Sequence, residues 1–285
     1  MKKASELAKG RDGGKGAIED ALRLGVAALD QQRAEEAERF ARDALARDPR
    51  HPEALHLLGL ALLAQGRARE ALTPLEQATR AHASPAREAH LGKALLQVGR
   101  TDEALAHLER AVDSKPPFAP AFRELGILLS TLRRFDQAEA VFKRGLEIEP
   151  TSVELSLDLG AFYILRADAR NAKIAFARAL VNAPRDTRAL HGLGVALLYE
   201  GDLTRAVERF RQVLAIQPGH PGAQLDLAQS LLQLGRADDA VAGLRSMVLA
   251  SPQSYGKALK ALVGSGRGRF FIRRSAAARF LNPEA

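Results

Sequence analysis

One unit of about 34 residues recurs seven times along this chain, from near Ile18 to near Pro252. Each of the first six units contains a Leu-Gly pair, and the seventh contains Leu-Ala: Leu24-Gly25, Leu58-Gly59, Leu91-Gly92, Leu125-Gly126, Leu159-Gly160, Leu193-Gly194 and Leu227-Ala228. An alanine returns later in every unit: Ala37, Ala71, Ala104, Ala138, Ala172, Ala206 and Ala240. A unit this short can bury its apolar face only against its neighbours, so the period predicts a stack of repeats rather than a closed domain.

The fifth unit, residues 153–186, shows how one repeat folds. Apolar residues recur at steps of three and four, first through Leu155 and Leu159 and then through Ala172 and Phe176, which is the spacing of two helix faces. A polar turn over residues 168–170 is expected between them. Pro184 ends the second helix because proline lacks the N–H that a helix interior needs. Each unit is therefore predicted to be a helical hairpin.

The charge of the chain lies in its ends. The net charge is +8, of which residues 1–16 carry +3 and residues 253–285 carry +6, so that the repeats together are close to neutral. There is no cysteine, which excludes disulfides and thiolate metal sites. The basic start has no apolar stretch behind it, and the longest apolar run is far shorter than the roughly 20 residues that span a bilayer. We expect a cytoplasmic protein. The ratio of 32 Arg to 10 Lys suggests a bacterial genome rich in G and C.

The recurring Leu-Gly pairs, alanines and unit-ending prolines resemble the tetratricopeptide repeat (TPR) family over about 235 residues. The family's aromatic in the second helix is present in the middle units as Phe142, Phe176 and Phe210. The resemblance implies an all-α, right-handed α-solenoid of seven helical hairpins with a C-terminal capping helix. The expected boundaries are a flexible basic leader over 1–16, the array over 17–252, the capping helix over 253–263 and a basic aromatic tail over 264–285.

In the TPR family the first helices of successive units line a concave groove that binds proteins. Carried over to this chain, the resemblance implies partner-binding residues at His56, Leu60, Lys93, Gln97, Arg123, Ile127, His191, Val195, Tyr199 and Gln229. This mixed apolar and polar wall suits an extended peptide or an amphipathic helix, although some of its apolar residues could instead pack between neighbouring helices. The asparagines of the family's chaperone-binding clamp have no counterpart here, since Leu60 and Ile127 occupy such places.

No motif in the chain indicates catalysis. Residues 10–16, Gly-Arg-Asp-Gly-Gly-Lys-Gly, lack the spacing and the hydroxyl residue of a phosphate-binding loop. The seven histidines are dispersed, and those that approach the groove are expected to be polar contacts rather than metal ligands. We therefore expect a scaffold or adaptor that is not an enzyme, with no cofactor, no metal and no small-molecule substrate.

The tail over 264–285 combines glycines, an apolar cluster at residues 270–272 and five arginines. Three interpretations stay open: it docks onto its own array, it anchors a partner protein or an anionic membrane surface, or its arginines bind nucleic-acid phosphates. The anion-binding residues in the last case would be Arg267, Arg269, Arg273, Arg274 and Arg279. The alternative function is thus a nucleic-acid or anionic-surface binder that uses the repeats as a spacer.

Overall fold

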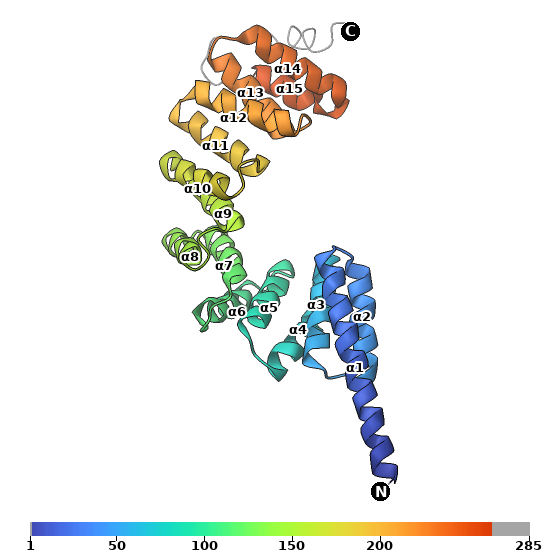
Figure 1. Cartoon of the computed structure of the whole chain (residues 1–285). Coiled ribbons are helices and arrows are strands. Elements are labelled where there is room, and N and C mark those ends of the chain that lie inside the picture. The colour runs from blue at the N-terminus through green and yellow to red at the C-terminus, as the bar shows by residue number, and fades with distance from the viewer. Residues whose placement is uncertain (1, 264–285) are drawn as a thin grey trace. The chain divides into compact units, whose positions relative to one another are not determined.

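The computed structural model of this protein describes the backbone of residues 2–263 and the side chains of residues 15–262. Every regular element among these residues is a helix, as the period predicted. Fourteen helices alternate as first and second helices of seven pairs (Figure 1): α1 (Lys2–Asp30), α2 (Ala34–Arg47), α3 (Pro52–Ala64), α4 (Ala68–Ala81), α5 (Pro85–Gln97), α6 (Thr101–Asp113), α7 (Ala119–Thr131), α8 (Phe135–Ile148), α9 (Val153–Leu165), α10 (Ala169–Asn182), α11 (Thr187–Glu200), α12 (Leu203–Ile216), α13 (Pro221–Gln233) and α14 (Ala237–Ala250). A short 3-10 helix, η1 (Pro252–Ser254), and α15 (Tyr255–Val263) follow.

The chain divides into two compact units, residues 1–141 and residues 142–285. In the first unit each helix packs on the next, and α1, α3, α5 and α7 also contact one another in turn. One of its buried clusters joins α3, α4, α5 and α6 through Leu62, Leu75, Leu95 and Ala104. The apolar side chains of one repeat are thus buried by the next repeat, which is why a single repeat could not hold its fold.

The second unit repeats this arrangement with larger side chains. Phe210 is fully buried in a cluster that joins α11, α12 and α13. At the end of the array, α15 packs on α13 and α14 and buries Ala258 and Leu262. Lys257 and Lys260 stay exposed on the same helix. The capping helix that the sequence predicted is therefore present as a helix that covers the last repeat.

The repeated glycine of the Leu-Gly pair marks a close approach between helices. A Cβ atom placed on Gly160 in α9 would lie 2.6 Å from Cε1 of Phe176 in α10, well inside contact distance. One placed on Gly192 in α11 would lie 2.4 Å from the same atom. The Phe176 ring, which is 5% exposed, therefore fills a slot between glycines of two successive repeats. Helix-to-helix distance depends on side-chain size at the contact, so glycine is required here despite its low helix propensity.

The turn inside each hairpin places one residue in the left-handed conformation. This residue is glycine in four turns, with φ between +74° and +84°: Gly66, Gly99, Gly201 and Gly235. In the other three it is Gln32, Arg133 or Ala167, with φ between +55° and +59°. A side chain at such a φ is strained, and nothing in the sequence period marks these three positions as requiring it.

Two boundaries differ from the expected ones. Helix α1 begins at Lys2, so the backbone of residues 2–16 continues the first repeat helix where the sequence predicted a flexible leader. This segment contains no proline to interrupt a helix. The turn expected over residues 168–170 lies earlier, because Oδ1 of Asp168 accepts the N–H of Asn171 at 3.0 Å and thereby starts α10 at Ala169. Within residues 2–263, no helix combines the length and the hydropathy that crossing a membrane requires.

Candidate functional site

The first helices of successive repeats present the residues that the sequence singled out for binding. We call the surface formed by the ten residues the first-helix face. In the first unit it consists of His56, Leu60, Lys93, Gln97, Arg123 and Ile127, and in the second unit of His191, Val195, Tyr199 and Gln229. None of the ten is buried. Ile127 is 44% exposed and Tyr199 is 63% exposed, although both are large side chains with apolar surface. The structure thus leaves this face accessible, and its role in binding stays a prediction.

Two histidines form a pair on the face of the first unit. Nε2 of His56 in α3 lies 2.9 Å from Nδ1 of His90 in α5, so one ring donates a hydrogen bond to the other. The edge of Phe118 covers His90, with ring centroids 5.6 Å apart. Burial lowers the pKa of both imidazoles to about 4, and the nearby Arg87 adds to the effect at His56. Both rings are therefore neutral at pH 7. Sequence reasoning placed His56 on the face but did not foresee its partner one repeat later.

Polar and charged groups on the face are paired between neighbouring repeats. Lys93 Nζ lies 3.3 Å from a carboxylate oxygen of Glu124, which belongs to the next first helix. In the second unit, Nε2 of His191 lies 2.8 Å from Oδ2 of Asp226, again on the next first helix. The His220 ring lies 5.0 Å from that of His191, and burial lowers the pKa of His220. The face is consequently more apolar in character than its residue types suggest.

This arrangement offers little for catalysis or metal binding. Across the described part of the chain, no three His, Asp or Glu side chains come together in a way that could hold a metal ion. His56, His90 and His191 form hydrogen bonds between neighbouring first helices, which is the role of polar contacts. The five arginines proposed for anion binding in the tail, Arg267, Arg269, Arg273, Arg274 and Arg279, lie outside the described residues.

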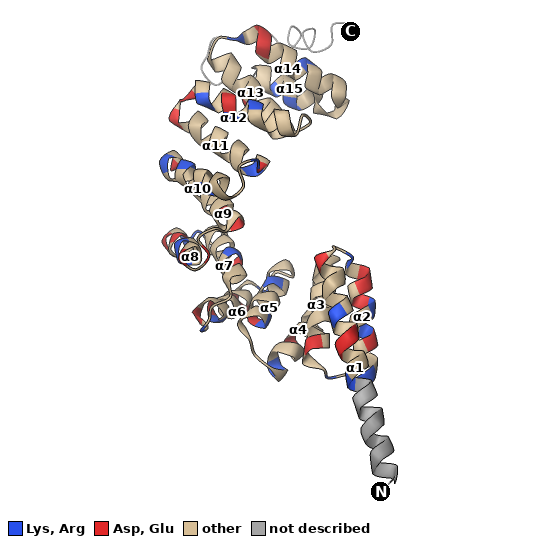
Figure 2. Cartoon of the chain, in the orientation of Figure 1, with Lys and Arg blue, Asp and Glu red and all other residues tan. Residues whose placement is uncertain are grey.

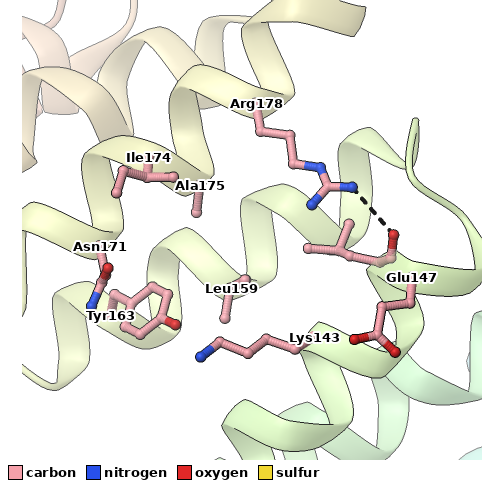
Figure 3. A pocket seen from close by; sticks show the side chains of 9 residues that line it. Lys143, Glu147, Leu159, Tyr163, Asn171, Ile174, Ala175 and Arg178 are labelled. Carbon is pink, nitrogen blue, oxygen red and sulfur yellow. Dashed lines mark hydrogen bonds between the residues drawn. The ribbon is translucent and has the colours of Figure 1, made fainter.

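Three cavities in the described part of the chain are lined by none of the ten residues of this face. Figure 3 shows one of about 520 Å³ between the C-terminal part of α8 and α10, with Leu159 and Tyr163 of α9 as its floor. Arg178 closes one end by donating from Nη2 to the carbonyl oxygens of Leu146 at 3.2 Å and Pro150 at 2.9 Å. A cleft of about 560 Å³ lies between the α2–α3 loop and the C-terminal end of α4, and another of about 230 Å³ lies between α12 and α14. Sequence reasoning missed them, because each cleft is lined by residues of two successive repeats that only packing brings together.

The paired helices and the accessible first-helix face define a helical-repeat protein. Family comparison specifies the class further: the tetratricopeptide repeat family matches residues 95–151 and 197–263, and a second profile of that name matches residues 166–221. The chain belongs to the tetratricopeptide repeat family. Residues 30–111 also match the family of anaphase-promoting complex, cyclosome, subunit 3. A comparison with curated protein sequences gives no match.

Solved structures with the same fold come from several systems. PilW, a widely conserved type IV pilus biogenesis factor, is 20% identical with a TM-score of 0.66, over 73% of this chain and 96% of that one. PilF of Pseudomonas aeruginosa is 19% identical with a TM-score of 0.63, over 74% of this chain and 97% of PilF. A chain of the APC/C hetero-tetramer Cut9–Hcn1 gives 15% identity and a TM-score of 0.64, over 87% of this chain and 52% of that chain. At such identities the likeness establishes the fold alone.

Proposed function

We propose that this protein is a non-catalytic scaffold that binds a partner protein through its first-helix face. The observation that carries the proposal is the pair of exposed side chains Ile127 and Tyr199, one in each compact unit, on helices whose other faces are buried. Large apolar side chains exposed on the face that the TPR family uses for binding are suited to packing against a partner. Burying one such side chain contributes about 1.5–3 kcal/mol.

The chemistry of the face favours a segment with an apolar side and few charges. Lys93 is paired with Glu124, His191 is within hydrogen-bond distance of Asp226, and the His56–His90 pair is neutral at pH 7. A strongly charged partner would therefore find few unpaired charges of opposite sign among these groups. An amphipathic helix or an extended apolar peptide fits better, and its binding should depend weakly on salt.

The test is a pull-down from a native lysate of the source cells with the full chain and two variants. Ile127→Asp changes the first-helix face, and Val181→Asp is the matched control, since Val181 is 80% exposed on α10, a second helix. We expect one defined protein to be retained at low and high salt by the wild type and by Val181→Asp, and to be lost with Ile127→Asp. Retention by all three proteins would overturn the proposal.

The same experiment addresses the alternative that the tail carries the function. Residues 264–285 hold five arginines and one glutamate, so binding through them to a polyanion should fall steeply with salt. A chain of residues 1–263 and a nuclease treatment are therefore included. Binding that disappears with the tail, with nuclease and with salt would assign the function to the tail and leave the repeats as a spacer.

A further inference from the structure

We propose a second binding site in the cleft between the α2–α3 loop and the C-terminal end of α4, which takes an acidic peptide segment with an apolar side chain. The cleft has a volume of about 560 Å³ and is lined by Pro49 and Arg50 of the loop, Leu55 of α3, and Gln77, Arg80 and Ala81 of α4. It lies in the first unit and shares no residue with the first-helix face. The site is thus independent of the function proposed above.

The charge lining this cleft is uncompensated. Among the residues that the structure describes, no Asp or Glu lines the cleft, whereas two arginines do. The guanidinium groups of Arg50 and Arg80 form no hydrogen bond or ion pair with any described residue, although many other arginines of the chain are paired. Guanidinium is a planar donor that matches a carboxylate in two parallel hydrogen bonds. The two side chains are therefore available to an anion.

The other two clefts of this kind are built differently. In the cleft between α8 and α10, Arg178 is occupied by the carbonyl oxygens of Leu146 and Pro150, and Glu147 adds a negative charge. The cleft between α12 and α14 is lined by Asp239 and by no basic side chain of the described residues. At the place in α4 that corresponds to Arg178, the chain has Gln77, which forms no such bond. Of these three clefts, only the one lined by Arg50 and Arg80 therefore presents two available cations.

The surroundings decide between a short acidic peptide and a polyanion. Helix α2 carries four acidic residues and three arginines, and α4 carries two acidic residues and two arginines, so that the helices beside the cleft carry both signs of charge. Figure 2 shows both signs of charge along α2. A nucleic acid would be repelled by the flanking carboxylates, whereas one or two carboxylates of a peptide would meet the arginines alone. Leu55, which is 7% exposed, supplies an apolar floor for a neighbouring side chain. The basic segments 1–16 and 264–285 of this chain have the wrong sign of charge to occupy the cleft.

The experiment selects ligands from a random peptide library displayed on phage, using the full chain as bait. Selected peptides are synthesised, and their affinities are measured by fluorescence anisotropy against the wild type, R50Q/R80Q and R39Q/R69Q. The last variant removes Arg39 of α2 and Arg69 of α4, two exposed arginines outside the cleft whose guanidinium groups form no hydrogen bond or ion pair with a described residue, so it is matched in charge. Thermal melts followed by circular dichroism establish that the variants are folded.

We expect peptides rich in Asp or Glu together with Leu or Ile. They should bind the wild type and R39Q/R69Q alike, lose about tenfold or more in affinity for R50Q/R80Q, and weaken as salt is raised. Selected peptides without acidic residues, or equal affinity for R50Q/R80Q, would refute the site. Loss of peptide binding in the Ile127→Asp variant would show that these peptides bind the first-helix face, and this would also refute the proposed site. If inorganic phosphate or a single-stranded oligonucleotide displaced the bound peptide, the ligand of the cleft would be that anion rather than a peptide, and the proposal would be overturned.

Discussion

Replacing Gly160 by alanine tests the argument that close helix contact fixes this fold. A Cβ atom there would overlap the ring of Phe176, which is held on its other side by Gly192. The ring cannot move away without disturbing both α9 and α11, and such overpacking costs about 1–3 kcal/mol. Alanine also favours the helix over glycine by about 1 kcal/mol, which offsets part of that cost. The two effects can be separated by a control.

Gly243 in the interior of α14 is the matched control, because a Cβ atom there would meet nothing within 4 Å. Gly243→Ala should therefore gain only the higher helix propensity of alanine, without a steric cost, and raise the free energy of unfolding by about 1 kcal/mol. We expect Gly160→Ala to be about 1–3 kcal/mol less stable than Gly243→Ala. Urea unfolding followed by circular dichroism measures this as a lower midpoint at an unchanged slope. If the two variants proved equally stable, the contact between Gly160 and Phe176 would not be what demands the glycine.

Three further predictions concern the turns, the caps and the histidine pair. Ala167→Gly relieves a left-handed backbone and should stabilise the protein by about 1 kcal/mol, whereas Ala177→Gly on the exposed side of α10 should cost about 1 kcal/mol; urea midpoints that move alike would contradict the strain argument. Asp168→Ala removes the N-cap of α10 and should lower the free energy of unfolding by about 1 kcal/mol, which an unchanged midpoint would disprove. The folded pKa of His56 and of His90 is about 4 against about 6.5 unfolded, so the unfolded state binds more protons between these values. The free energy of unfolding should therefore be highest above about pH 6.5 and should fall toward pH 4, by at most about 3 kcal/mol per histidine. In urea titrations at several pH values, H56L/H90L should show a weaker pH dependence than the wild type. An equal dependence in the two proteins would count against the pair.

Much of the fold could be predicted from the chain because the repeat constrains it many times over. The seven-fold recurrence of Leu, Gly and Ala predicts helix pairs, and the structure has them at the expected places. The capping helix was also predictable, since Tyr255, Leu259 and Leu262 recur at helical spacing while polar Lys257 and Lys260 fall between them. The residues of the first-helix face were carried over from the resemblance to the TPR family, and none of the ten is buried in the structure.

Features that depend on two repeats at once could not be foreseen in this way. Sequence reasoning treated His56 as an isolated polar residue, whereas its neighbour in space is His90, 34 residues later, and burial of that pair sets their protonation. The same holds for the left-handed residue of each hairpin turn: glycine marks it in four repeats, but Arg133 and Ala167 give no sign of it.

The amino-acid order alone settled the architecture, because a helix period repeated every 34 residues or so leaves a chain only one way to bury its apolar faces. Tertiary structure decided where a ligand could bind. The availability of Arg50 and Arg80, and the occupation of Arg178 by backbone carbonyls, depend on how residues of successive repeats, distant in the sequence, pack together. Side chains of the same type thus differ in function because packing, rather than composition, determines which of them still lack a partner.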